Sequence, residues 1–460
     1  MKSLNVAVLI GALFTLPVVS APKAPQNPLP SCPPDWKVEV IAEVPDILQP
    51  SVVCVTPDGR VLVGQDPMDQ SPEGLKPIDS ILCYHPDGRV TVWATNLYAI
   101  FGMAYYDGKV YVHQYPKLTL FTDSGDTGTN PEELFTTHPK PIGGLNDHIP
   151  ANLRLAMDGY FYMDTGDKGI YGAVGKDGSR VDLLGGGIMR FRPDATELEI
   201  YANGTRNHLD IAMNWEDEMF TYDNTDDGNG WWTRVTHMVD RGWYGYPYDY
   251  KPRRPYTLWM LQDYGGGSPT GAIGYNEDAL PEEYHGNLFM SEWGKGELDR
   301  FIVQRDGATY KIVKREAFMK KQGKEFRPLG LDITPDGMGF YVADWNYGGW
   351  MSKGSAAGRF LKVTYTGSSR ASPKPSWYVP AAMGKPTVAS LNDLLAGLQH
   401  PSQRVRLVAQ RRIGEKGQSA VAGLVKVMKD KSLPAYARAS ALWTLDRIDG
   451  GKSARAAILE

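Results

Sequence analysis

Short runs of alternating apolar and polar residues recur between positions 51 and 366, and tight turns separate them. Alternation with a period of two predicts half-buried β-strands, and an Asp-Gly turn between two such runs predicts a hairpin. The unit is clear where the Asp-Gly turn at 57–59 precedes the apolar run at 61–63. Turns of this kind are centred on positions 58, 107, 158, 217, 287 and 336, so successive units are 49, 51, 59, 70 and 49 residues apart. These intervals indicate a repeated structural unit.

A second apolar run follows most of these turns and predicts a second hairpin in each unit. Such runs occupy positions 80–84, 118–121, 188–191, 300–303 and 359–363. Two hairpins give four strands per unit, which is the composition of a propeller blade. We therefore predict an all-β six-bladed β-propeller over residues 22–366. The alternative, an irregular β-sandwich, does not predict six near-equal intervals.

The longest interval, between positions 217 and 287, contains an insertion rich in tryptophan and tyrosine. Its aromatic residues include Trp231, Trp232, Trp243, Tyr244, Tyr246 and Trp259. Long insertions in compact domains are usually functional loops or disordered segments, and disordered segments contain few aromatic residues. The insertion is therefore expected to be a functional loop, whose rings either stack on sugar rings or pack between blades.

The pattern changes after residue 366. Positions 367–388 are rich in proline and serine and predict a linker, whereas 389–460 are rich in alanine, leucine, arginine and valine at helical spacing. The Val-Arg-x-x-Ala segment at 405–409 is followed 32 residues later by Ala-Arg-x-x-Ala at 437–441. This spacing predicts an all-α C-terminal segment of HEAT-like helical repeats that is incomplete, since solenoids need about three repeats. Its expected role is scaffolding or protein docking.

The N-terminal residues and the composition indicate where the protein works. Lys2, an apolar run over 6–19 and small residues at 19–21 predict a signal peptide over residues 1–21. The mature protein is therefore expected to be exported to the periplasm or the extracellular space. A formal net charge of −4, with no dense Lys/Arg block before residue 400, excludes nucleic-acid binding. Cys32, Cys54 and Cys83 permit one disulfide at most, and buried free thiols are the alternative for Cys54 and Cys83.

Polar stretches in the predicted propeller contain residue types suited to catalysis. Asp147 and His148 stand at the entry to a predicted strand pair, where a carboxylate can orient an imidazole that accepts a proton from a hydroxyl. A structural polar contact is the alternative interpretation of this pair. The loop at 223–230 combines oxygen donors with glycine, which suits Ca²⁺ better than zinc, although an acidic turn is more often simply solvated.

Taken in order, these stretches resemble the soluble quinoprotein glucose/sorbosone dehydrogenase family. The resemblance rests on Asp147-His148 followed by the Gly-Asp-Lys-Gly run at 166–169, on the Gly-Thr-Arg-Asn run at 204–207 followed by the acidic loop, and on Arg327 before the turn at 335–337. It covers residues 40–366. With its helical tail, the chain is most similar to the large membrane-bound dehydrogenases of planctomycete-type bacteria, which often add a cytochrome c segment.

The resemblance implies oxidation of a sugar or other alcohol by pyrroloquinoline quinone (PQQ). In this scheme His148 removes the hydroxyl proton while a hydride passes to the quinone, and Asp147 holds the imidazole in the required tautomer. A separate electron acceptor, such as a cytochrome c, is then required.

The same resemblance implies roles for residues around the cofactor. Arg206 and Asn207 would face the quinone oxygens, and Lys295 and Arg327 would bind the cofactor carboxylates, because guanidinium and ammonium groups suit such anions. A calcium ion would polarise the quinone. The calcium ligands implied are the backbone carbonyls of Thr225 and Asp226.

Two other functions fit the same predicted architecture. One is a Ca²⁺-dependent lactonase or other hydrolase, in which Asp147 and His148 activate water. The other is a non-catalytic propeller that binds a glycan or a protein. Propellers support many functions, so the fold alone does not decide between them.

Overall fold

Six β-sheets of four or five strands follow one another along the chain in the computed structural model, which describes residues 28–67, 77–138, 146–226, 231–249, 254–323, 326–346, 358–386 and 388–460. Each sheet is one blade. The innermost strands are β2 (Pro50–Val55), β6 (Ile100–Tyr106), β10 (Pro150–Leu155), β16 (Ala212–Met213), β21 (Pro269–Gly274) and β25 (Pro328–Ile333). Contacts join β2 to β6, β6 to β10, β16 to β21 and β21 to β25, and β25 packs beside β2. The predicted six-bladed β-propeller is therefore confirmed.

The remaining strands complete each blade outward from the centre. The second strands are β3 (Val61–Gln65), β7 (Lys109–Gln114), β11 (Phe161–Thr165), β17 (Met219–Asn224), β22 (Leu288–Glu292) and β26 (Gly339–Asp344). The third strands are β4 (Asp79–Tyr84), β8 (Lys117–Asp123), β14 (Gly186–Phe191), β18 (Trp232–Met238), β23 (Glu297–Asp306) and β27 (Arg359–Tyr365). The outer strands are β5 (Val90–Leu97), β9 (Gly128–Thr136), β15 (Glu199–Thr205), β20 (Gln262–Gly266), β24 (Thr309–Lys320) and β1 (Trp36–Glu43).

The sixth blade combines the two ends of the propeller sequence. Its outer strand is β1, which pairs antiparallel with β27 from Trp36 opposite Tyr365 to Glu43 opposite Arg359. Main-chain hydrogen bonds between the first and last strands thus close the ring, and β27 is not left with an unpaired outer edge. The alternating pattern did not predict this pairing.

Two additions interrupt the regular blades. Strands β12 (Ile170–Val174) and β13 (Arg180–Leu183) form a separate hairpin between the second and third strands of the third blade, where the sequence repeat gave no sign of it. A short strand, β19 (Gly242–Trp243), pairs in parallel with β15. Both additions lie in the longer intervals of the repeat, 158–217 and 217–287.

The turns that revealed the repeat all lie on one face of the propeller. Each connects the innermost strand of a blade to its second strand, as in the β2–β3 turn, where Gly59 has a φ of +90° that favours glycine. We call this side the turn face. The opposite face therefore collects the residues that precede each innermost strand and those that follow each second strand.

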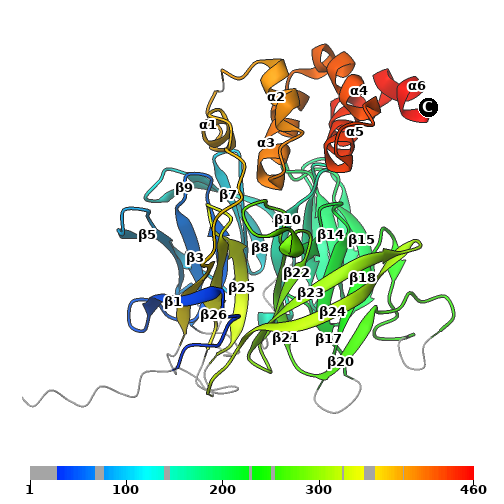
Figure 1. Cartoon of the computed structure of the whole chain (residues 1–460). Helices are drawn as coiled ribbons and strands as arrows, with labels where there is room; N and C mark the ends of the chain where they lie inside the picture. Colours follow the sequence, from blue (N-terminus) through cyan, green and yellow to red (C-terminus); the bar gives the residue numbers. More distant parts are fainter. Residues whose placement is uncertain are drawn as a thin grey trace, which may run out of the picture.

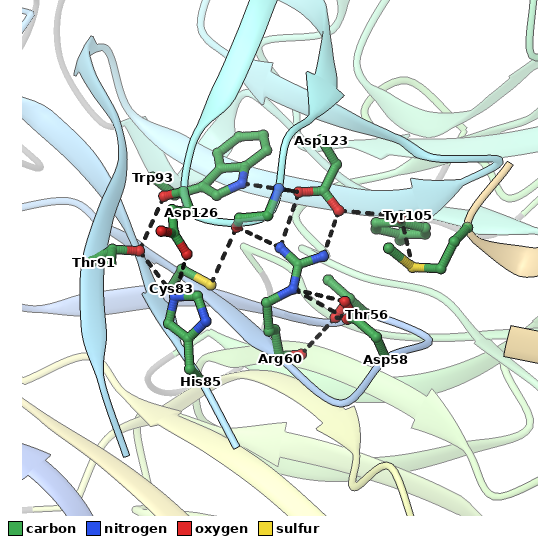
Figure 2. Close-up of polar contacts among 12 residues, drawn as sticks. Thr56, Asp58, Arg60, Cys83, His85, Thr91, Trp93, Tyr105, Asp123 and Asp126 are labelled. Carbon is green, nitrogen blue, oxygen red and sulfur yellow. Dashed lines mark hydrogen bonds and ion pairs between the residues drawn. The ribbon is translucent and has the colours of Figure 1, made fainter. Parts of the chain in front are cut away.

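Side chains pack tightly between neighbouring blades. Tyr111 of the second blade and Phe161 of the third have ring centroids 4.6 Å apart. Between the first and second blades an ionic contact accompanies the apolar packing. The Arg60 guanidinium donates two hydrogen bonds to Asp123, at 2.9 and 2.6 Å, and a third to Asp58 at 3.0 Å (Figure 2). Trp93 and Tyr105 also donate to Asp123.

A helical segment follows the propeller, and its helices are grouped at one end of the strands (Figure 1). It contains α1 (Tyr378–Ala382), α2 (Leu391–Gly397), α3 (Gln403–Gly414), α4 (Val421–Lys429), α5 (Ala435–Asp449) and α6 (Arg455–Leu459), with short 3-10 turns over Gly417–Ala420 and Lys452–Ala454. Ser390 caps α2 in a capping box with Asp393. The two matching sequence motifs begin at the third residue of α3 and of α5; their HEAT-like classification stays a prediction.

Helix α3 rests on the turn face. Arg404 donates to Asp332 at 2.8 Å, Gln403 donates to Asp217 at 2.6 Å, and Gln410 donates to the carbonyl of Met157 at 3.1 Å. The predicted linker at 367–388 contains α1, in which Tyr378, Ala381 and Ala382 are buried in the helical core, so this stretch is partly structural.

Two further predictions concern the location of the protein and its thiols. In the part of the chain that the structure describes, no helix has the length and apolar character needed to cross a membrane. The predicted signal peptide, residues 1–21, lies outside the described residues. Cys32, Cys54 and Cys83 all carry free thiols, and the last two are buried.

Candidate functional site

A cavity of about 480 Å³ opens on the face opposite the turn face. Its lining comes from the segments that precede innermost strands and follow second strands, which converge there from the third, fourth, fifth and sixth blades. Six of the eight site residues predicted from the sequence line it, namely Asp147, His148, Arg206, Asn207, Lys295 and Arg327. The propeller thus brings together residues up to 180 positions apart, between 147 and 327.

His148 ends a short 3-10 turn, Asn146–His148, that leads into β10. Its Nδ1 atom lies 2.5 Å from Oδ1 of Asp167, in the segment that follows β11. Among the described residues, none forms a hydrogen bond with the other ring nitrogen, Nε2. Burial alone would raise the pKa of the Asp167 carboxyl, but the hydrogen bond and charge of His148, together with Arg206, hold that pKa below its usual value. Asp167 is therefore an ionised partner that fixes the orientation of the ring.

The carboxylate that holds the imidazole is Asp167 and not Asp147, so the predicted role of Asp147 is wrong. Asp147 is buried and lines the same cavity, but its Oδ1 atom has no hydrogen-bond partner in the described structure. The physical reason is that consecutive residues of a 3-10 turn point in different directions, so neighbours in sequence do not face each other.

Arg206 and Asn207 enter the cavity from the loop after β15. The Arg206 guanidinium donates to Oδ1 of Asn224 at 2.6 Å and lies 2.5 Å from Oδ1 of Asp226 and 3.7 Å from Oδ2 of Asp167. Asn207 is buried, and its side-chain oxygen has no partner among the described residues.

A glycine allows this close packing. A Cβ atom at Gly166 would lie 2.3 Å from the side-chain oxygen of Asn207 and 2.8 Å from Cα of His148. Only glycine leaves room for His148 and Asn207 to approach each other here.

Lys295 and Arg327 supply two further cations, and neither forms an ion pair with a described residue. The Lys295 ammonium donates to the carbonyl of Tyr264 at 3.0 Å. Arg327 donates to the carbonyls of Trp293 and Gly294 at 2.7 and 2.8 Å, and its guanidinium lies 4.4 Å from the centre of the Trp293 ring. Their charges remain available to an anion in the cavity.

Buried carboxylates hold the loops that present these cations. Glu292, at the end of β22, accepts hydrogen bonds from the backbone N–H groups of Ser268 and Lys295. Asp344, at the end of β26, accepts from the backbone N–H of Arg327 at 2.7 Å. Both carboxylates are fully buried, so each determines where the neighbouring cation stands.

The predicted calcium ligands do not line the cavity. Thr225 is buried, and the Asp226 carboxylate is already bound to Arg206 and to the Tyr246 hydroxyl. The described residues contain no group of three or more His, Cys, Asp or Glu side chains placed to hold a metal ion. Positions 227–230 of the predicted loop lie outside the described residues.

Several residues that line the cavity or hold its lining in place were not singled out from the sequence. Asp167 is part of the Gly-Asp-Lys-Gly run at 166–169, but the sequence pattern did not indicate that it would bind His148. Asn224 and Glu292 carry a positional signal, since each is the last residue of a second strand, at the face where the cavity opens. Of the aromatic insertion, Tyr244 is buried and donates to the carbonyl of His237 at 2.6 Å, whereas Trp231 lines the cavity.

Comparisons with known proteins agree on the fold. The sequence matches the family described as "Domain of unknown function (DUF7133)" over residues 30–348. A search of curated proteins found no match. A Thermus thermophilus protein assigned as an oxidoreductase (glucose dehydrogenase) superimposes with a TM-score of 0.53 at 20% identity, covering 71% of this chain and 99% of that one.

Two other solved structures are similar to this chain. A glucose dehydrogenase has a TM-score of 0.53 at 16% identity, covering 71% of this chain and 98% of its own. A Trichoderma reesei protein of Carbohydrate-Active Enzymes Family AA12 has a TM-score of 0.50 at 11% identity, covering 75% and 100%. At these identities the likeness is one of fold. Because the family match covers well over half of the sequence, this chain belongs to the DUF7133 family.

Proposed function

We propose that this protein is an oxidoreductase that oxidises a sugar or another alcohol with PQQ, and that His148 is the general base. The single observation that carries the proposal is the pairing of His148 Nδ1 with Asp167, which leaves Nε2 without a partner among the described residues at a cavity lined by unpaired cations. An imidazole held in this way can accept the proton of a substrate hydroxyl.

The chemistry of the cavity fits a planar, polyanionic quinone. Lys295 and Arg327 provide positive charge without an ion-pair partner among the described residues, which suits the carboxylates of PQQ. Trp293 provides a flat apolar surface. The side-chain oxygen of Asn207 is buried without a partner among the described residues, and such a group is normally satisfied by a ligand or water. When bound, PQQ would supply the hydride acceptor.

The residues of this chain would divide the remaining work. His148 Nε2 would take the hydroxyl proton, and the Asp167 carboxylate would stabilise the imidazolium that results. Arg206, held by Asn224 and Asp226, would direct its guanidinium toward the quinone oxygens. Glu292 would keep Lys295 at the cavity wall.

The proposal includes partners beyond the cavity. A calcium ion near Thr225 and Asp226 remains part of the proposed cofactor set, but Asp226 is bound to Arg206, so we derive no step through the metal. The protein is proposed to be exported and to pass electrons to a separate acceptor such as a cytochrome c. Docking of a protein through the helical segment belongs to the same proposal.

Reconstitution tests the proposal directly. The purified chain is mixed with PQQ, with and without Ca²⁺, and reduction of an artificial dye is measured with a panel of sugars and alcohols. We expect PQQ-dependent reduction, and we expect His148→Ala to lower turnover by about 10²–10⁴-fold. His285→Gln is the matched control, because His285 is exposed and bonded to the carbonyl of Leu280 away from the cavity.

Two outcomes would contradict the proposal. A folded protein that neither binds PQQ nor reduces dye is not a quinoprotein. Hydrolysis of lactones without PQQ, abolished by a chelator and by His148→Ala, would instead show that the same dyad activates water.

A further inference from the structure

Exposed tryptophans of the fourth blade extend the cavity wall outward. Trp231 lines the cavity with 53% of its surface exposed, and Trp232, the first residue of β18, is 38% exposed. Trp259 is 40% exposed and lies 5.9 Å from the guanidinium of Arg234, which stands on the same face of β18 as Trp232 because the two are two positions apart. We call Trp231, Trp232 and Trp259 the aromatic platform.

The strand beside the platform has no side chains at its end. Strand β20 is the outer strand of the blade, and its residue Gly266 pairs with Trp232. Gly266 and Gly267 also line the cavity, and a Cβ atom at Gly265 would meet nothing within 4 Å. The backbone groups of Gly265 and Gly267 are hydrogen-bonded within the blade. Since this end of β20 has no side chains, nothing there prevents the approach of a flat ligand to the rings.

Both the exposure and the backbone of Trp231 are unfavourable for the protein alone. Trp231 has a φ of +55°, in the left-handed region, which a bulky residue adopts far less readily than glycine does. Because the Trp231 side chain is exposed, the protein does not gain the free energy of burying this large apolar group. Such features cluster at sites where a ligand compensates for them.

From this arrangement we infer that the aromatic platform binds a second pyranose ring of an oligosaccharide whose terminal ring enters the cavity. The apolar face of a sugar ring stacks on an indole, while its hydroxyls bond the nearby carboxylate of Asp263. The inference rests on the proposed sugar oxidation and specifies its substrate class as oligosaccharides rather than free monosaccharides.

Binding can be measured without any catalytic activity. Maltotetraose and cellotetraose are titrated into the protein free of cofactor, and affinity is followed by calorimetry and tryptophan fluorescence. We expect at least one of them to bind, and Trp231→Asn and Trp232→Ala each to weaken that affinity by about tenfold, the loss of one stacking contact. Asn tolerates the left-handed backbone, so Trp231→Asn should fold as well as the parent chain.

Trp443→Ala is the matched control. Trp443 is 38% exposed, like Trp232, but lies on α5 in the helical segment. It should not change oligosaccharide affinity. Equal weakening by all three variants, or no binding of either tetrasaccharide, would overturn the inference.

Turnover of the PQQ-loaded protein separates this inference from the proposed function. If monosaccharides are oxidised but kcat/KM does not rise for oligosaccharides and is unchanged in Trp231→Asn, the platform inference fails while the oxidation chemistry stands. If tetrasaccharides bind but nothing is oxidised, the proposed function fails and the platform remains. If Trp231→Asn slows only the reduction of a c-type cytochrome, the platform docks the electron acceptor and the inference is wrong.

Discussion

Removal of Asp123 should destabilise the propeller more than removal of any exposed charge. Its carboxylate is fully buried and accepts two hydrogen bonds from Arg60, one from Trp93 and one from Tyr105 (Figure 2). Burial alone would raise the pKa of Asp123, but Arg60 outweighs burial and holds the pKa below its usual value. The pair therefore remains ionised and joins the first two blades.

The expected loss of stability follows from the free-energy cost of leaving a buried charge without its partner. Asp123→Ala leaves the 5%-exposed Arg60 guanidinium with only Asp58 as an ionic partner, and breaking such a buried pair costs about 3–5 kcal/mol. Unfolding of residues 36–365 should carry an entropy of about 0.7 kcal/mol/K, so Tm should fall by about 4–7 °C. Differential scanning calorimetry measures this change.

Three further variants test the reasoning. Arg60→Met leaves the Asp123 carboxylate without its cation and should destabilise the protein by a similar amount. The double variant Arg60→Met with Asp123→Asn removes both charges and keeps an acceptor for Trp93 and Tyr105. The double variant should therefore be more stable than Arg60→Met alone. Asp87→Ala breaks an exposed pair with Arg89 and should leave Tm unchanged. A Tm for Asp123→Ala equal to that of the parent, or a double variant less stable than both singles, would refute the account.

Three other predictions concern the site and the junction with the helices. Asp167→Asn should slow PQQ-dependent dye reduction by roughly 10–100-fold, and Asp147→Asn by less, because only Asp167 holds the imidazole; equal effects would contradict this. Burial raises the pKa of Asp217 from 3.8 to about 7, so the folded state retains a proton that the unfolded state releases, and stability to urea should fall as pH rises from about 4 to about 7. Asp217→Asn should flatten that dependence; an unchanged slope would assign it to other groups. Glu292→Gln sets an amide N–H against the backbone N–H of Lys295 or Ser268 and should cost about 1–3 kcal/mol in urea unfolding; parent-like stability would show that its carboxylate is not needed.

The repeat was visible in the sequence because each blade contains its own local signals. A turn such as the one at Gly59 requires a left-handed backbone, and the strands beside it alternate with a period of two, so both features can be recognised without knowledge of the rest of the chain. The pairing of β1 with β27 joins segments more than 300 residues apart, and no local pattern encodes such a contact.

The sequence predicted which residues gather at the candidate site better than it predicted which of them bond to each other. His148, Arg206 and Arg327 meet because strand entries share one face of a propeller, which follows from the fold. The partner of His148 was mistaken because nearness in sequence was taken for nearness in space. The acidic loop suggested calcium from its composition, but composition does not show that the Asp226 carboxylate is bound to Arg206.

The closure of the sixth blade has a consequence for biogenesis. Trp36 and its neighbours have no antiparallel partner until the segment ending at Tyr365 has been synthesised, so the circular architecture cannot assemble blade by blade into a finished state during translation. Most native contacts would wait for one late, long-distance encounter, which favours slow, highly cooperative maturation.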